Sequence, residues 1–324
     1  MIRFKPLVIL ICTALVASLA FAEEPTKAGG TQIAMLGTGT PNPFPDRSGP
    51  SIAIVVNDQA YLVDFGPGVV RQAAALSPEF GGDIPGLAVS QLKHAFLTHL
   101  HSDHSVGFPD LLFTSWTQGR DTPLTLVGPE GVQVMADGIH HAYQEDISYR
   151  LYGQEPANNQ GWRVNAIEIS EPGLVYEDDN IKVEAFNVPH GSWPNALGYR
   201  FTTPDKVIVI SGDTAPSETL TEYATGADVL IHEVYSLEGF QTKEPKWQRY
   251  HAKNHTSTHE LAEIAKVAQP GLVILYHQLF WGSTHEQLLK EMAETGTMTH
   301  GDWMATTIEA IVDFAAYNLS SASS

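Results

Sequence analysis

The sequence has a single cysteine among 324 residues, and this residue, Cys12, lies in an apolar N-terminal run. A disulfide framework is therefore excluded, and the rest of the chain has no thiolate to act as a nucleophile or metal ligand. Positive charge is also scarce: 18 Lys and Arg stand against 37 Asp and Glu, and the formal net charge is −19. Such a surface repels nucleic-acid backbones, so we expect no nucleic-acid partner.

Internal repeats of short period are absent, and the only low-complexity tract is the Ser-rich last five residues. The hydrophobic fraction is 43% and the charged fraction 17%, which is enough to bury a sizeable core. Fourteen histidines are many for this length and justify a search for metal sites.

The N-terminus has the pattern of a cleavable export signal over residues 1–22. Arg3 and Lys5 precede an apolar run, which ends in Ala20-Phe21-Ala22. Cleavage after Ala22 predicts a periplasmic or secreted protein without membrane contact; an uncleaved anchor helix is the alternative. Cleavage would also remove Cys12 and two positive charges, so the formal charge of the remaining chain would be −21. Residues 23–30 are predicted to be a flexible lead-in, and residues 31–324 a single domain.

Periodicity and turn residues predict strands and helices in alternation along the domain. Strands are predicted at 31–37, 51–56, 60–66, 92–99, 124–129, 164–169, 174–179, 181–190, 196–203, 207–213, 227–235 and 272–277. Helices are predicted at 67–77, 105–116, 131–143, 257–268 and 284–296, the fourth with a capping-box pattern. Residues 145–165 are polar and are expected to be irregular, and the segment after residue 302 is open between helix and strand. This order suggests packed sheets with helices outside.

Three histidines and one aspartate stand within six residues at the end of the predicted strand 92–99. They are His99, His101, Asp103 and His104, in the stretch LTHLHSDHSVG. Imidazole nitrogens and carboxylate oxygens are ligands that borderline divalent metals accept. A histidine-rich surface loop without metal is the alternative, but a crowded HxHxDH pattern at a strand end favours a metal site.

Three further candidate ligands follow apolar runs elsewhere in the chain. His190 ends NVPH, Asp213 lies in SGDT after VIVI, and His277 ends LVILYH. Each alone would more often be a buried core residue. Because all three lie at the carboxyl ends of predicted strands, where loops gather, we expect them near the HxHxDH stretch.

This set of motifs resembles the metallo-β-lactamase superfamily, and within it the branch of ribonuclease Z and the secreted arylsulfatase-like enzymes. The matching pieces, in family order, are LGTGTPNP, THLHSDH, NVPH, ALGYRF, SGDT, LIHEVY, HTSTHE and LYH, and they span roughly residues 33–277. The resemblance implies an α/β fold, a four-layer αββα sandwich in which helices flank two mixed sheets. It also implies a metal-dependent hydrolase of ester bonds.

The resemblance further implies two Zn²⁺ ions per chain, with Mn²⁺ or Fe²⁺ as alternatives. One ion would be held by His99, His101 and His190, and the other by Asp103, His104 and His277. Asp213 would bridge the two ions. Ions bridged in this way lie roughly 3.5–4 Å apart and share a hydroxide, which would be the nucleophile.

A second implied feature is an acid–histidine pair, Glu233 and His255. His255, oriented by Glu233, would protonate the leaving oxygen; the alternative is that His255 only caps the following helix. Asp103 is assigned to catalysis together with this pair.

The substrate is expected to be a small anionic ester. The family's RNA-gripping arm has no room in this chain, because His190 and Asp213 are only 23 residues apart. We therefore expect a sulfate ester of an alcohol or phenol, with a phosphodiesterase as the alternative. A lactonase or β-lactamase, or a non-catalytic metal-binding protein, is less favoured. A homodimer is left open.

Substrate contacts are sought in the polar stretch 145–165. Its aromatic and basic side chains suit an aryl group and an anion. The candidates are Tyr149, Arg150, Tyr152 and Trp162. A structural loop with a surface arginine is the alternative for each of them.

Overall fold

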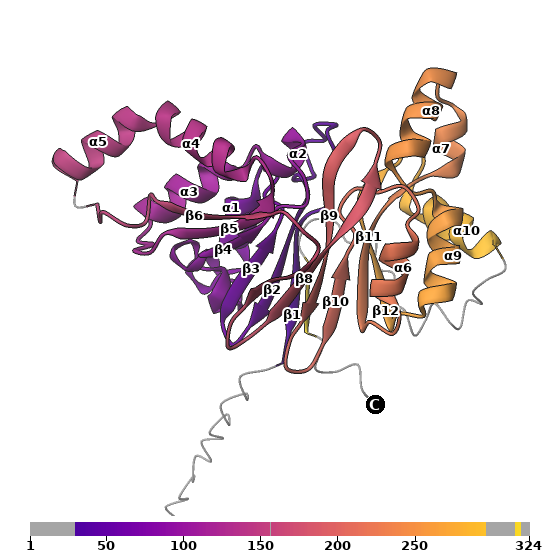
Figure 1. The fold of residues 1–324 in the computed structure, drawn as a ribbon, viewed down its shortest axis with the longest axis horizontal. Helices are drawn as coiled ribbons and strands as arrows, with labels where there is room; N and C mark the ends of the chain where they lie inside the picture. Colours follow the sequence, from indigo (N-terminus) through magenta and orange to yellow (C-terminus); the bar gives the residue numbers. More distant parts are fainter. Residues whose placement is uncertain (1–29, 156, 296–314, 319–324) are drawn as a thin grey trace, which may run out of the picture.

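Two β-sheets packed face to face form the centre of the protein, and helices cover the outer face of each sheet (Figure 1). The computed structural model describes residues 30–155, 157–295 and 315–318. The predicted export signal and nearly all of the predicted lead-in lie outside these ranges. Within them, no helix is both long enough and apolar enough to cross a membrane.

Both sheets contain parallel and antiparallel strand pairs. The first sheet runs β13 (Ala315–Asn318), β1 (Gln32–Gly37), β2 (Ser51–Val56), β3 (Gln59–Val63), β4 (His94–Phe96), β5 (Leu124–Pro129) and β6 (Val164–Ile169). The second sheet runs β12 (Leu272–Leu279), β11 (Val229–Tyr235), β10 (Val207–Ile210), β9 (Trp193–Thr202), β8 (Lys182–His190) and β7 (Gly173–Glu177). The predicted αββα sandwich is confirmed.

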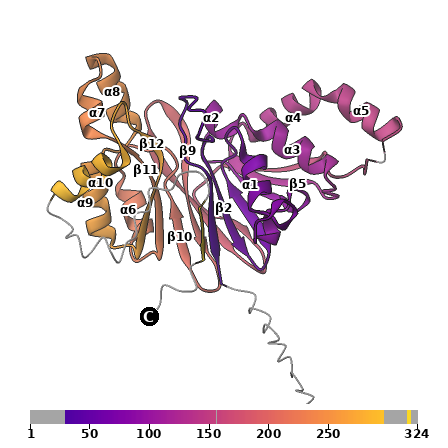
Figure 2. The same ribbon diagram turned by 180° about the vertical axis from the view of Figure 1, so that it is seen from behind.

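The helices pack in two groups, one on each sheet (Figures 1 and 2). The first group is α1 (Val69–Leu76), α2 (Ser102–Ser105), α3 (Phe108–Thr117), α4 (Val132–Ala142) and α5 (Gln144–Tyr152). The second is α6 (Glu218–Ala224), α7 (Leu237–Gln241), α8 (Pro245–Asn254), α9 (Thr258–Ala268) and α10 (His285–Glu294). Three short 3₁₀ turns, Pro78–Phe80, Pro85–Leu87 and Val89–Gln91, connect α1 to β4.

Local sequence accounts for several element boundaries. Asn57 and Asp58 both have positive φ, and they form the two-residue turn that joins β2 to β3 in register. The predicted capping box is confirmed at α9, where Ser257 and Glu260 bond reciprocally to each other's backbone N–H groups. The C-terminal segment, left open by the sequence, includes β13, which pairs antiparallel with β1; its remaining residues lie outside the described ranges.

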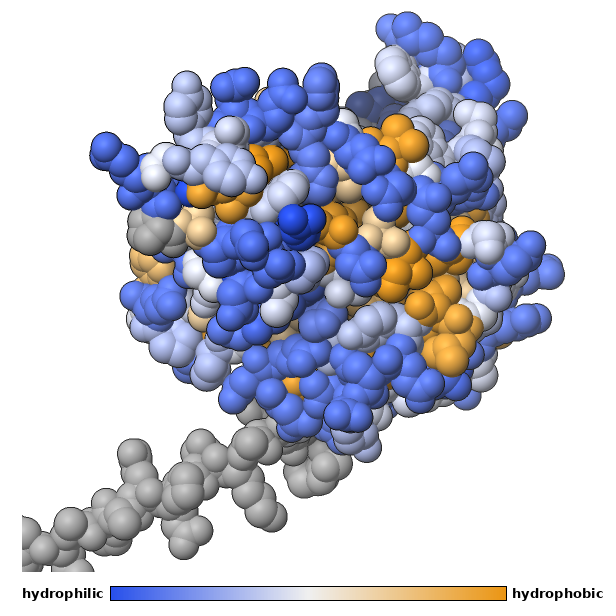
Figure 3. Space-filling view, turned by 60° about the vertical axis from the view of Figure 1, so that its left-hand side comes forward, coloured by the Kyte–Doolittle hydropathy of each residue, from blue (hydrophilic) through white to orange (hydrophobic). Residues whose placement is uncertain are grey.

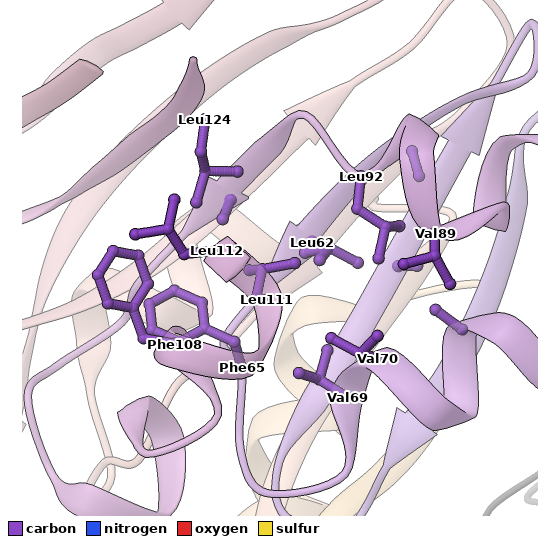
Figure 4. Packing of buried hydrophobic residues seen from close by; sticks show 14 of the residues in the cluster. Leu62, Phe65, Val69, Val70, Val89, Leu92, Phe108, Leu111, Leu112 and Leu124 are labelled. Carbon is purple, nitrogen blue, oxygen red and sulfur yellow. The ribbon is translucent and has the colours of Figure 1, made fainter. Parts of the chain in front are cut away.

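The core is built in layers because the strands of the first sheet bury both faces. In β1, Ile33 and Met35 point between the sheets, whereas Ala34 and Leu36 point toward the outer helices. A continuous apolar run is expected of a strand covered on both sides. Figure 4 shows the outer layer, where Val69 and Val70 of α1 and side chains of α3 pack on the sheet.

Surface interactions contribute little to the stability of the fold. Hydrophilic residues predominate on the face shown in Figure 3, and apolar residues lie in separate patches between them. The ion pair between Arg71 and Asp110 is accessible to solvent, and such surface pairs typically contribute less than about 1 kcal/mol. Burial of the two-sheet core therefore supplies most of the stability.

One predicted irregular segment is helical in its first part. Residues 145–165 contain most of α5, a helix with one buried side chain, Ile147. The helix is supported by Glu145 and Asp146 in its first turn and by an ion pair between Arg150 and Asp146. The sequence expectation was wrong here because so few apolar residues leave no clear 3.6-residue period.

Parallel strand pairs determine where a site can form. β3, β4, β5 and β6 run parallel in the first sheet, and β10, β11 and β12 run parallel in the second. Ligand sites in such sheets lie outside the carboxyl ends of the strands. The two sheets present these ends at the same edge of the sandwich, near α2 and α8 (Figures 1 and 2).

A buried arginine holds the periphery of the first sheet together. Arg120, fully buried, donates hydrogen bonds to the carbonyls of Leu92, Leu111, Leu112 and Gly161 at 2.8–3.2 Å. Burial lowers the pKa of its guanidinium to about 9. The side chain thus satisfies four carbonyls from three separate segments.

We expect Arg120→Met to lower the free energy of unfolding by about 3 kcal/mol, because four buried carbonyls lose the hydrogen bond that the guanidinium donates. Urea denaturation followed by circular dichroism measures this change. Arg71→Met removes an exposed arginine instead and should change the value by less than about 0.5 kcal/mol. Equal stability of Arg120→Met and the unsubstituted protein would show that these hydrogen bonds contribute nothing net.

Candidate metal centre

The seven predicted ligands come together at the edge where the two sheets meet. His99 and His101 follow β4, and Asp103 and His104 lie in α2. The second sheet brings His190 at the end of β8, Asp213 after β10 and His277 within β12. All are buried except His101, which is partly exposed.

Three imidazoles form the first group of candidate ligands. His101 Nδ1 lies 2.9 Å from His99 Nε2 and 3.2 Å from His190 Nε2. The opposite ring nitrogens are already engaged, since His190 Nδ1 donates to the Asn254 carbonyl and His99 Nδ1 contacts the Thr98 hydroxyl. The remaining nitrogens converge on one point, which is the arrangement that a bound cation requires.

The second group consists of Asp103, His104 and His277. His277 Nε2 lies 3.2 Å from Asp103 Oδ2, and His104 Nε2 lies 3.5 Å from the same oxygen. Asp213 connects the groups, with its carboxylate 3.4 Å from both His104 Nε2 and His277 Nε2 and 3.9 Å from His99 Nε2. The buried atoms His104 Nε2 and Asp213 Oδ1 have no hydrogen-bond partner. Such orphaned polar atoms fit a divalent cation held by nitrogen and oxygen.

A β-bulge directs His277 into the site. Glu233 pairs with Tyr276 and Val234 with Gln278, so His277 is the extra residue on β12. Its φ is 43°, a value that non-glycine residues rarely adopt. Bulges of this kind often redirect a side chain toward a functional site.

Asp64 is a functional candidate that sequence reasoning missed. It follows β3, is buried, and accepts hydrogen bonds from the Thr98 backbone N–H at 2.8 Å and from His104 Nδ1 at 2.8 Å. A carboxylate on the far nitrogen of a ligand histidine fixes its tautomer and ring orientation. Its signal was the one used for Asp213, an aspartate directly after an apolar strand.

Opposing electrostatic effects act on these groups. Burial lowers the pKa of His99 well below its usual value, and His104 adds to this effect. Burial would raise the pKa of Asp213, but His277 and His104 hold it well below its usual range. For His104, burial is outweighed by Asp213 and Asp64, which raise its pKa. A cation therefore competes with a proton at His104 and binds more weakly in acid.

The predicted pair of Glu233 and His255 is also in contact. Glu233 Oε1 lies 3.2 Å from His255 Nδ1, and it accepts from the backbone N–H groups of Thr214 and Thr256. Burial raises the pKa of Glu233 and lowers that of His255 to about 4. His255 follows α8 in extended conformation and lines a cavity of about 450 Å³ together with Asp103, Asp213 and His277. Burial thus favours the neutral form of both groups, so a proton can pass between the Glu233 carboxyl and the His255 ring beside the candidate ligands.

The predicted substrate contacts lie elsewhere. Tyr149, Arg150 and Tyr152 belong to α5, which projects from the first sheet on the side away from α8 (Figure 1). Arg150 pairs with Asp146 and Glu155, and Trp162 packs against His140 and Arg163. None of the four predicted residues lines the cavity beside the candidate ligands. Only the tertiary structure reveals this, because α5 was expected to be a loop free to fold over the site.

We expect Asp64→Asn to weaken zinc binding by about 10- to 100-fold, because His104 loses the carboxylate that orients it. Titration of the metal-free protein with zinc against a competing chelator measures the affinity. Asp110→Asn, which changes an aspartate on the outer helix α3, should leave the affinity unchanged. If both variants bind zinc like the unsubstituted protein, Asp64 has no role in ligand orientation.

Comparison with known proteins identifies the family. The sequence profile described as "Beta-lactamase superfamily domain" matches residues 59–278. A ribonuclease Z from Mycobacterium bovis is 32% identical over 253 residues, covering 76% of this chain and 85% of the relative.

Solved structures agree on the fold. The metallo-β-lactamase fold protein YhfI from Bacillus subtilis has a TM-score of 0.62 at 17% identity, over 89% of this chain and 99% of that protein. The short form of human tRNase Z has a TM-score of 0.59 at 20% identity, over 76% and 93%. These likenesses support the sandwich alone.

The comparisons bear on two expectations, the absence of a nucleic-acid partner and the choice between a sulfate ester and a phosphodiester as substrate. The expectation of no nucleic-acid partner is contradicted, since the curated relative that covers three quarters of the chain is a ribonuclease. That expectation relied on net charge, which averages over the whole surface. The relatives also favour the phosphodiesterase alternative over the sulfate-ester interpretation. The prediction of a metal-dependent ester hydrolase is confirmed, and the chain belongs to the metallo-β-lactamase superfamily, in its ribonuclease Z branch.

Proposed function

We propose that the protein is a zinc-dependent phosphodiesterase that hydrolyses phosphodiester bonds of RNA. The observation that carries the proposal is the convergence of seven side chains with nitrogen or oxygen ligand atoms, Asp213 among them, beside the pair of Glu233 and His255. The similarity to ribonuclease Z over three quarters of the chain supports the choice of a phosphodiester.

Two ions would share the ligands as the sequence motifs suggest. His99, His101 and His190 would hold one, and Asp103, His104 and His277 the other, with Asp213 shared. This mixture of imidazole and carboxylate suits zinc, and also manganese or iron. When bound, such ions supply Lewis acidity that polarises a phosphoryl oxygen and makes water acidic enough to attack at neutral pH.

The chain's own residues would then orient the substrate and move protons. Glu233 is held by two backbone N–H groups and fixes the ring of His255 on the cavity wall. His255 would deliver a proton to the leaving oxygen, which otherwise departs as an unstable alkoxide. Asp103 faces the same cavity and would help to position the reacting groups.

The substrate would have to be bound by elements other than the RNA-binding arm of ribonuclease Z. The structure connects β8 to β9 by a tight turn through Gly191, which leaves no extension between His190 and Asp213 except a strand pair. We also propose, from the N-terminal pattern, that the chain is exported, so that its RNA substrate would be extracellular or periplasmic.

The proposed function is tested by comparing turnover of bis(p-nitrophenyl) phosphate with that of p-nitrophenyl sulfate. We expect the phosphodiester to be preferred, and Asp213→Ala to lower its turnover by at least about 1,000-fold. The same variant should lose bound zinc in elemental analysis, because one carboxylate serves both groups; Asp110→Ala is the control. A strong preference for the sulfate would overturn the proposal in favour of an arylsulfatase.

His255→Ala should retain zinc but lose turnover by about 100-fold or more on esters with poor leaving groups. The loss on bis(p-nitrophenyl) phosphate should be smaller, since p-nitrophenolate needs little protonation to depart. Glu233→Gln, which keeps the size of the side chain, should show the same pattern more weakly. An equal loss on good and poor leaving groups would rule out the role of proton donor.

A further inference from the structure

A basic and aromatic segment overhangs the metal centre in an otherwise acidic protein. Residues 243–253, KEPKWQRYHAK, contain four of the chain's 18 Lys and Arg and a single acidic residue. They follow α7 and form most of α8, at the end of the sandwich that also carries α2 (Figures 1 and 2). Local positive charge of this kind attracts anionic ligands despite the net charge of the molecule.

The aromatic side chains of α8 lie on the side of the helix that faces the cavity. Trp247, Tyr250 and His251 stand at helical spacing and line the cavity together with Lys243 and Trp281. We call these five residues the α8 platform. Trp247 and Tyr250 remain 48% and 42% exposed, so both rings are accessible to a ligand that enters the cavity.

Ring contacts connect the platform to the reaction centre. The centroids of Trp247 and His251 are 6.0 Å apart, those of His251 and His255 are 5.6 Å apart, and those of His255 and His277 are 5.6 Å apart. A ring lying on Trp247 or Tyr250 is therefore close to the candidate ligands. Lys243 Nζ lies 4.7 Å from the Trp281 ring, at the mouth of the same cavity.

Helix α8 is held at its C-terminal end, and the preceding helix α7 is held at its start, so the platform has a defined position. At its C-terminal end, the carbonyls of Lys253 and Asn254 accept from Gly191 N and His190 Nδ1. At the start of α7, the backbone N–H groups of Leu237 and Glu238 donate to the carboxylate of Glu291, which lies on α10. Such preorganisation favours binding because little ordering remains to be done.

We propose that the α8 platform binds the nucleoside adjoining the scissile phosphodiester. The base stacks on one of the two rings, Trp247 or Tyr250, and meets the other edge-on because these rings are nearly perpendicular, at 88°; the Lys243 ammonium attracts the phosphate. Stacking on aromatic rings beside basic side chains is how single-stranded nucleic acids are held without sequence preference. This inference rests on the proposed function and supplies the substrate grip that the absent arm does not.

The test compares adenosine 5′-monophosphate with ribose 5-phosphate as inhibitors of bis(p-nitrophenyl) phosphate hydrolysis by the zinc-loaded enzyme. They share the sugar phosphate and differ in the base. We expect the nucleotide to inhibit about tenfold or more tightly, and Trp247→Ala and Tyr250→Ala each to reduce that ratio by several-fold. Trp247→Phe should restore most of it. Lys243→Gln should weaken both inhibitors together.

Tyr152→Ala is the matched control, because Tyr152 is an exposed aromatic on α5, away from the cavity. It should leave the ratio unchanged. The proposal is overturned if the two inhibitors bind equally well, or if the ratio survives both alanine variants on α8.

Failure of the proposed function can be distinguished from failure of the α8 platform, because binding can be measured without turnover. If the unsubstituted enzyme does not hydrolyse bis(p-nitrophenyl) phosphate, the same ratio is measured by quenching of tryptophan fluorescence, and the platform is judged on that. Comparing uridine 5′-monophosphate with an eight-residue oligouridylate separates the two sources of nucleoside. Tighter binding of the oligomer supports polymeric RNA, and equal binding supports a mononucleotide ester; both support the platform.

Discussion

The carboxylate of Asp213 is the buried charge around which the site is organised. It lies 3.4 Å from His104 and His277, 3.9 Å from His99 and 4.0 Å from His255. An ionised carboxylate in a protein interior is costly unless cations or hydrogen-bond donors surround it. The site must therefore lie where strand ends from both sheets meet, since no single segment supplies enough partners.

The groups around the ligands determine their orientation. Asp64 and Thr98 hold His104 and His99 from the first sheet, and the Asn254 carbonyl holds His190 from the end of α8. These contacts are made by main-chain groups or short side chains, which have little freedom to move. The same helix end continues into His255, and Trp247, Tyr250 and His251 lie on this helix, so α8 connects a candidate ligand, His255 and the wall of the cavity.

Net charge proved a poor guide to the substrate. The excess of acidic residues is real, but the charge that a ligand meets is local, and residues 243–253 bring four Lys and Arg and one acidic residue close to the cavity, which Lys243 lines. Electrostatic potential falls off over about 10 Å at ordinary ionic strength, so four basic residues near the site matter more than distant carboxylates. Helix α5 was missed for another reason, because it is supported by charges in its first turn and an ion pair and has too few apolar residues to show a helical period.

The sequence alone determined the candidate ligands and, through family resemblance, the sandwich. His190, Asp213 and His277 could be predicted because each follows an apolar run, and the carboxyl ends of such strands gather at one edge. The bulge at His277, the support of His104 by Asp64, and the remoteness of Arg150 and Trp162 were decided only by the tertiary structure. These features depend on contacts between segments far apart in the chain, and local sequence patterns do not predict such contacts.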